Sequence, residues 1–288
     1  MRLRKLLSWL PFKRFRNPPP VVTVVPLTGV IGRLGAFQQG LTLRSVAANL
    51  ERAFEWPDVK AVALSINSPG GSPVQSALIA KRIRALSAEH EVPVFAFAED
   101  VAASGGYWLL TAGDEMFADD SSIIGSIGVV SAGFGFPDLL KRIGVERRVY
   151  TSGAHKAGLD PFRPEEAEEV EHLHSIQEDV HEAFRAQVRD RRAGKLTVAE
   201  DELFNGRFWS GRAAVVLGLV DAIGDLRGTM RERFGEDVKL KLISDGRPWW
   251  RRRLEFLSRD DAVPVTGDLA QGFVAALDEY LTWQRYRL

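Results

Sequence analysis

The sequence contains no cysteine. This absence excludes disulfide bonds, thiolate nucleophiles, iron–sulfur clusters and cysteine-based zinc sites. Histidine is scarce as well, with five residues among 288, so histidine-dependent chemistry has few candidates. Neither sign of charge is in excess, since 38 basic residues balance 38 acidic ones. A balanced chain lacks the basic field that general nucleic-acid binding needs, so we expect no nucleic-acid partner.

Long hydrophobic runs are also missing near the first residue. The run Leu6–Phe12 is seven residues long and is followed by Lys13 and Arg14. A membrane-spanning helix needs about 20 apolar residues, and a cleavable secretory signal ends in a small-residue site. We therefore expect neither a transmembrane helix nor a cleavable signal. The expected location is cytoplasmic, with peripheral contact at the inner membrane face.

Both ends of the sequence combine basic and aromatic residues. Residues 1–16 hold six basic residues and no acidic one, which suits either contact with anionic lipid or a disordered basic tail. Trp249 and Trp250 precede three arginines, and residues 267–286 have apolar residues at helical spacing, typical of core or subunit contact. We predict three parts: a basic segment with a proline spacer (1–20), a central domain (21–245) and a C-terminal basic and aromatic segment with a helix (246–288).

The middle of the sequence alternates between strand and helix patterns. Strands are predicted at 21–32, 61–67, 92–99, 116–118 and 145–150. Helices are predicted at 45–54, 74–86, 102–112, 136–143 and 164–192. Repeated βαβ units favour an α/β fold with a mainly parallel sheet flanked by helices. The longest helix should bury an apolar stripe that runs from Val170 to Val188.

Common cofactor and metal motifs are not found. The sequence has no P-loop and no H-E-x-x-H, and the GxG at Gly133 and Gly135 is followed by Pro137 rather than by a dinucleotide-binding helix. His172, His174 and His181 lie on the predicted long helix, where solvated histidines are the ordinary interpretation. We expect no cofactor and no metal site.

Two glycine-rich elements each follow a predicted strand and open a helix. In Asn67–Ser72 (NSPGGS), Gly70 and Gly71 either form a plain turn or let the backbone approach a ligand with free N–H groups. In AASGGYW (102–108), Ser104 is either a helix N-cap or an exposed hydroxyl against a substrate. In the second case the Gly105 N–H would face a developing oxyanion.

A third element, TSGAHKAG (151–158), sets Lys156 among small residues and glycines. A surface lysine is the default interpretation. A partly buried lysine is instead easily held neutral, and then acts as a general base if a serine is at hand.

Together these three motifs resemble the signal peptide peptidase A family in its short bacterial form. Its members are serine peptidases with the fold shared by Clp protease subunits and crotonases. The 52 residues between Ser104 and Lys156 are similar to the spacing in the short members, and GRFWSGRA (206–213) followed by GLVD (218–221) matches a further family segment. The resemblance covers about residues 21–245, the predicted peptidase domain.

The resemblance implies a role for each matching residue. Ser104 would be the nucleophile, Lys156 the general base, and Ser126 either the hydroxyl that orients the lysine amine or a simple loop residue. The N–H groups of Gly105 and Gly70 would form the oxyanion hole, with Gly71 as the alternative to Gly70.

The implied activity is that of a serine endopeptidase with a Ser-Lys dyad. Its substrates would be unstructured peptides, such as signal-peptide remnants or other membrane-associated peptides, pairing with residues 127–132 as an extended edge. The resemblance also implies a homo-oligomeric ring such as an octamer. The sequence leaves open whether the dyad forms within one chain or between neighbours.

Two other functions are alternatives to a peptidase. A crotonase-type acyl-CoA enzyme would use the same pair of amides without Ser104 and Lys156. A non-catalytic scaffold that binds peptides or membranes would suit the basic first segment but would leave the serine and lysine motifs unexplained. The family's usual N-terminal membrane anchor has no counterpart among the hydrophobic runs here.

Overall fold

The structure is a computed structural model that describes residues 18–32, 40–153 and 155–244. The predicted basic segment 1–16, Trp249, Trp250 and the predicted helix at 267–286 lie outside the described residues.

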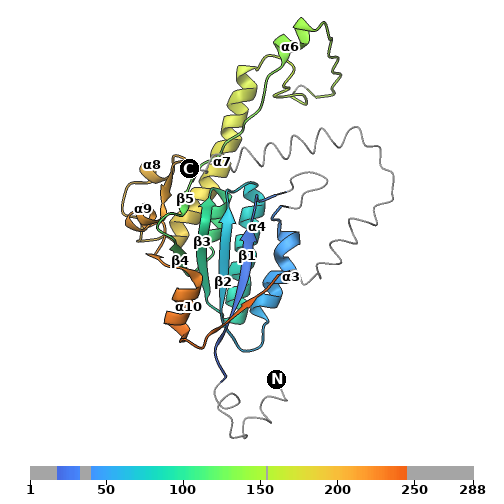
Figure 1. Ribbon diagram of the computed structural model, residues 1–288. Coiled ribbons are helices and arrows are strands. Elements are labelled where there is room, and N and C mark those ends of the chain that lie inside the picture. Colours follow the sequence, from blue (N-terminus) through green and yellow to red (C-terminus); the bar gives the residue numbers. More distant parts are fainter. Residues whose placement is uncertain (1–17, 33–39, 154, 245–288) are drawn as a thin grey trace, which may run out of the picture.

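One eight-stranded sheet organises the described chain (Figure 1). Its main path runs β6-β5-β3-β2-β1-β8, and β4 pairs with β3 and β7. Every pairing is parallel except that of β5 with β6. The predicted α/β class with a mainly parallel sheet is therefore confirmed. The strands are β1 (Val21–Thr28), β2 (Val59–Ser68), β3 (Val94–Ala103), β4 (Glu115–Ala118), β5 (Ile123–Gly125), β6 (Phe208–Ser210), β7 (Ala222–Ile223) and β8 (Lys239–Leu242).

Helices cover both faces of this sheet. One face packs against α3 (Leu43–Phe54), α4 (Pro73–His90) and α5 (Gly105–Leu110), and the other against α10 (Leu226–Phe234). Strand β2 supplies both cores because its side chains alternate: Leu64 and Ile66 face the first group of helices, while Ala63 faces the α10 side. A strand buried on both faces explains the nearly continuous apolar run in its sequence.

The chain leaves the sheet after β5 and builds a projecting arm, defined here as residues 127–176. Figure 1 shows α6 (Pro137–Arg142) at the far end of this arm and α7 (Ala167–Arg191) returning from it to the sheet. The predicted helix at 164–192 is thus confirmed. Its apolar stripe is buried only at Phe184 and Val188, because the first half of α7 extends past the sheet.

Two predicted elements differ in the structure. Residues 145–150 are exposed and irregular rather than a strand, since no described segment pairs with them despite their β-rich composition. The helix predicted at 102–112 is shorter, because β3 continues to Ala103 and α5 begins only at Gly105.

Several short elements had no prediction. They include β5, β6, β7, β8, α8 (Glu200–Leu203) and α9 (Gly211–Val216), and they are too short for a period of side chains to appear. Within the described ranges, the structure contains no helix with the length and apolar composition needed to cross a bilayer.

Candidate active site

Ser104 occupies the sharp turn between β3 and α5. Its backbone has a positive φ, with φ 52° and ψ −122°, which is strained for a residue with a side chain. Two backbone hydrogen bonds fix the turn: the Ser104 N–H donates to the Gly125 carbonyl at 2.7 Å, and the Ser104 carbonyl accepts from Trp108 at 3.0 Å. Although Ser104 stands at the N-cap position, its side chain makes no capping hydrogen bond. The strained turn therefore holds a half-buried hydroxyl that is not used for capping.

The glycine loop after β2 lies directly against this turn. A Cβ added at Gly70 would stand 2.7 Å from the Cβ of Ser104 and 2.8 Å from the nitrogen of Gly105. Gly70 also has φ +104°, so both space and backbone conformation require glycine there. The predicted neighbours Gly70, Ser104 and Gly105 are thus brought together.

The backbone N–H groups around Ser104 differ in their partners. The Gly70 N–H donates to the Ser68 hydroxyl at 3.2 Å. The Ile31–Gly71 bridge uses the Gly70 carbonyl and the Ser72 N–H, and no described residue accepts the Gly71 N–H. The Gly105 N–H begins α5, where no acceptor exists within the helix, and no described residue accepts it either.

Ser126 lies beside Ser104 at the same edge of the sheet. The parallel strands β3 and β5 pair Ala103 with Gly125 at their last residues. Ser104 directly follows β3 and Ser126 directly follows β5, so the two serines are neighbours. Ser126 is buried and has φ 54°, and its N–H donates to the Arg207 carbonyl at 2.7 Å. The structure thereby gathers both serines and the glycine loop at the carboxyl ends of three neighbouring strands, where open α/β sheets place ligands.

Lys156 is not part of this gathering within one chain. It lies in the arm, in an exposed loop between α6 and α7, rather than in the partly buried setting that its small neighbours suggested. Among the described residues no hydrogen bond or ion pair joins its amine to Ser104 or Ser126. The contacts of the surrounding loop stay within the arm, so one chain holds the serine side of the predicted site without the lysine.

The residues that hold α5 in place next to the Ser104 turn could not be predicted from any sequence motif. The Tyr107 hydroxyl donates to the Leu219 carbonyl at 2.8 Å, and burial raises the pKa of this phenol far above its usual range. The Trp108 ring stacks on Phe184 at 4.7 Å, which joins α5 to α7. These contacts fix the helix whose first N–H groups adjoin Ser104, and only tertiary structure reveals them.

A charged cluster anchors the chain segment next to Tyr107. Arg192 is 1% exposed and pairs with Asp221 at 2.9 Å, while Lys195 reaches the same carboxylate at 2.7 Å. Burial alone would raise the pKa of Asp221, but Lys195, the Met116 N–H and Arg192 together hold it below its usual value. The carboxylate is therefore charged in the folded protein at neutral pH.

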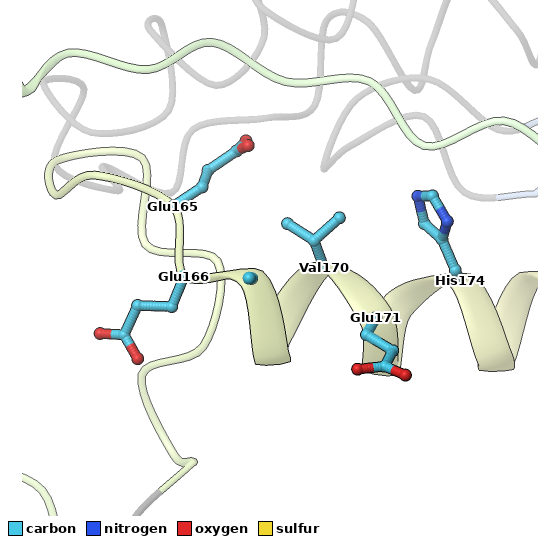
Figure 2. Close-up of a pocket in the computed structure, with 6 residues that line it drawn as sticks. Glu165, Glu166, Val170, Glu171 and His174 are labelled. Carbon is cyan, nitrogen blue, oxygen red and sulfur yellow. The ribbon is translucent and has the colours of Figure 1, made fainter.

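An open depression also lies away from the two serines. This depression of about 510 Å³ lies at the start of α7, where Figure 2 shows Val170 and His174 on the same side of the helix. It includes neither serine and lies on the arm, so it is not the site that the motifs predict. Over the described residues, no group of three or more histidines and carboxylates is arranged to hold a metal ion.

Much of the chain is similar to known proteins. The model of peptidase family S49 matches residues 87–241, which include both serines and Lys156. A putative signal peptide peptidase SppA from Enterococcus faecium is 38% identical over 178 residues, covering 61% of this chain and 50% of that protein. Putative protease slr0021 from Synechocystis is 33% identical over 200 residues, covering 67% of this chain and 70% of that protein.

One similar protein has a name of another kind. The Na(+)/H(+) antiporter NhaA of Brucella abortus is 50% identical over 288 residues, which cover 98% of this chain but 39% of that protein. The chain thus spans between about two fifths and one half of the first curated relatives it matches. The part shared with the antiporter-named protein includes nearly all of this chain and hence the stretch matched by the peptidase family. On the strength of that stretch and its peptidase relatives, the chain belongs to peptidase family S49, the family of the signal peptide peptidase A enzymes.

Proposed function

We propose that this protein is a serine endopeptidase in which Ser104 is the nucleophile and Lys156 the general base. The observation that carries the proposal is the Ser104 turn: a strained backbone, a hydroxyl without a capping role, and the adjacent Gly105 N–H without an acceptor among the described residues. A strained serine next to free amides is the arrangement that acyl transfer needs. A simple helix cap needs none of these features.

The proposed reaction has two stages, acylation of Ser104 and hydrolysis of the resulting ester. The neutral Lys156 amine accepts the hydroxyl proton while the Ser104 oxygen bonds to the peptide carbonyl carbon. The resulting oxyanion accepts hydrogen bonds from the Gly105 N–H and from Gly70 or Gly71. The C–N bond then breaks, the leaving amine takes the proton from Lys156, and an ester to Ser104 remains. Water, giving a proton to Lys156, hydrolyses this ester, and the proton returns to the Ser104 oxygen.

Ser126 would hold the lysine amine in line with Ser104. The pairing of Ala103 with Gly125 supports this role, because it sets the two serines side by side. Peptide substrates would lie along residues 127–132, which follow Ser126 and belong to no strand in the described part of the chain. An unstructured peptide suits such an edge because it is free to add a strand.

The second donor of the oxyanion hole would be Gly71 or Gly70. The Gly70 N–H is engaged by the Ser68 hydroxyl, whereas the Gly71 N–H has no described acceptor. This difference favours Gly71 more than the sequence alone did. Gly70 would still be needed because only a glycine fits against Ser104.

The lysine would come from a neighbouring copy of the chain. Lys156 is exposed on the arm, and the arm also exposes large apolar side chains, among them Phe134 at 72% and Tyr150 at 89%. Large apolar side chains exposed together on one arm are typical of a surface that another chain covers. A second copy that covers the arm would complete the Ser104 site and build the homo-oligomer that the family resemblance implies.

The test is covalent labelling of the purified protein with a fluorophosphonate, read by mass spectrometry, together with cleavage of an unstructured peptide. Wild type should carry the label on Ser104 and cleave the peptide. Ser104→Ala and Lys156→Ala should each lose both signals. Cleavage that persists in Ser104→Ala overturns the mechanism, and a correctly assembled protein with neither signal supports the scaffold function instead.

A further inference from the structure

The loop that carries Lys156 is bonded at two points just after the lysine to a single charged pair. The Ala157 carbonyl accepts a hydrogen bond from Arg163 at 3.0 Å, and the Leu159 N–H donates to Glu169 at 2.9 Å. Arg163 and Glu169 form an ion pair with each other, and Arg163 also pairs with Glu166. The pair therefore connects the loop to the first turn of α7.

The conformation of this loop depends on these bonds. Leu159 has φ 55°, a left-handed conformation that is costly for a side chain of this kind. Its N–H is the group that the Glu169 carboxylate accepts. The hydrogen bond from Leu159, followed by the hydrogen bond and charge of Arg163, holds the pKa of Glu169 below its usual value. The carboxylate is thus charged at neutral pH and holds a strained residue in place.

A second ion pair fixes the far end of the loop. Arg147 pairs with Asp160 at 3.0 Å, and the Asp160 side chain is 6% exposed. The Arg147 guanidinium also lies 4.7 Å from the centre of the Phe162 ring. The loop is consequently held from α7 and from the segment after α6, although it belongs to an arm with little buried surface.

Nothing within one chain explains why the Lys156 loop is fixed by so many bonds. Lys156 is exposed, and a surface lysine without a function does not need a strained residue three positions after it. We propose that Arg163 and Glu169 are positioning residues that hold Ala157 and Leu159 so that the Lys156 amine is aimed at Ser104 of a neighbouring copy. This inference rests on the proposed function and adds the residues through which the base is aligned.

The pair of Arg163 and Glu169 is called the clamp from here on. The test compares two variants of the clamp with two matched controls on the same arm. Glu169→Gln removes the charge that pairs with Arg163, and Arg163→Lys keeps the charge but loses the forked geometry. Glu168→Gln and Arg142→Lys are the controls, because both residues are exposed and form no hydrogen bond or ion pair with the described residues of the loop. Peptide cleavage, unfolding temperature and oligomeric mass are measured for each.

The clamp variants should lower kcat about tenfold or more while KM changes less than about twofold, because a displaced base slows the chemistry without weakening substrate binding. Unfolding temperature and oligomeric mass should stay near those of wild type, and the controls should match wild type throughout. A clamp variant that keeps its full kcat while Lys156→Ala is inactive overturns the inference alone. An active Lys156→Ala overturns the proposed function itself.

A mixing experiment assigns the clamp to the copy that donates the arm. Lys156→Ala copies are mixed with Ser104→Ala copies, so that activity requires a serine from the first and a lysine from the second. Glu169→Gln should reduce the restored activity when it is carried by the Ser104→Ala copies and leave it unchanged in the Lys156→Ala copies. Equal loss in both arrangements would indicate a general structural role and contradict the inference.

Discussion

At the scale of single residues, the site depends on how closely two backbones approach each other. Gly70 touches the Ser104 turn so closely that an added Cβ would meet Ser104 and Gly105 below 3.0 Å. The sequence predicted either a plain turn or a backbone that approaches a ligand at these glycines, and the structure places Gly70 against the Ser104 turn. What is approached could not be predicted, because the contact joins two loops more than 30 residues apart.

Gly70→Ala should therefore disable the site, and Gly29→Ala is its matched control. Both glycines have φ +104°, so alanine at either should lower the free energy of unfolding by about 1–3 kcal/mol. Of these two glycines, only Gly70 has neighbouring atoms that an added Cβ would contact too closely. Fluorophosphonate labelling of Ser104 should slow about 100-fold in Gly70→Ala and stay unchanged in Gly29→Ala. Equal labelling rates would show that the close approach does not shape the nucleophile.

Asp221 should make the free energy of unfolding decrease at low pH. Its pKa is lowered in the folded protein, so its stabilising contribution is full above the unfolded value of about 4 and is lost as pH falls through the folded value. Asp221→Asn leaves the buried Arg192 without its charge partner and should cost about 2–4 kcal/mol at pH 7.

Urea unfolding from pH 7 to pH 3 measures this effect. The difference in free energy of unfolding between wild type and Asp221→Asn should shrink as the pH approaches 3. A difference that stays constant over this range would contradict the assignment.

At the scale of secondary structure, long periodic segments were predictable and short ones were not. The helix predicted at 164–192 is α7, because its apolar residues recur over many turns. The strand predicted at 145–150 has the right composition but no described partner, and a strand is defined by its pairing. Strand β5 has three residues, too few for a pattern, yet it fixes the position of Ser126 beside Ser104.

The contact between α5 and α7 should be important for stability. Phe184 is 3% exposed and stacks on Trp108, so Phe184→Ala should lower the free energy of unfolding by about 3–5 kcal/mol. Val216→Ala serves as the control on an exposed helical position, with a change within about 0.5 kcal/mol. Chemical denaturation measures both, and a small effect at Phe184 would mean that α7 is not needed to hold α5.

At the scale of the whole molecule, the arm separates the predicted dyad. The motif spacing led to Ser104 and Lys156 as a pair, but it contained nothing about whether one chain or two would join them. The described chain holds Ser104 at the end of β3 and Lys156 on the exposed arm. We therefore expect the active form to contain more than one copy.

Charged substitutions on the arm test this expectation. Phe134→Asp and Tyr150→Asp place a carboxylate on apolar surface that a neighbouring copy would cover, so oligomeric mass and peptide cleavage should fall together. Val216→Asp is the control, because Val216 is 69% exposed on α9, outside the arm. Analytical ultracentrifugation gives the mass. A wild-type protein that is monomeric and active would contradict the shared site.

The most direct test of the central claim is the rescue of Ser104 labelling across copies. Lys156→Ala protein is treated with a fluorophosphonate alone and after mixing with Ser104→Ala protein, and mass spectrometry locates the adduct. We predict no adduct in either variant alone and an adduct on Ser104 of the Lys156→Ala copies after mixing. Variants that co-assemble and still show no adduct, while wild type is labelled, would contradict a site built from Ser104 of one copy and Lys156 of the next.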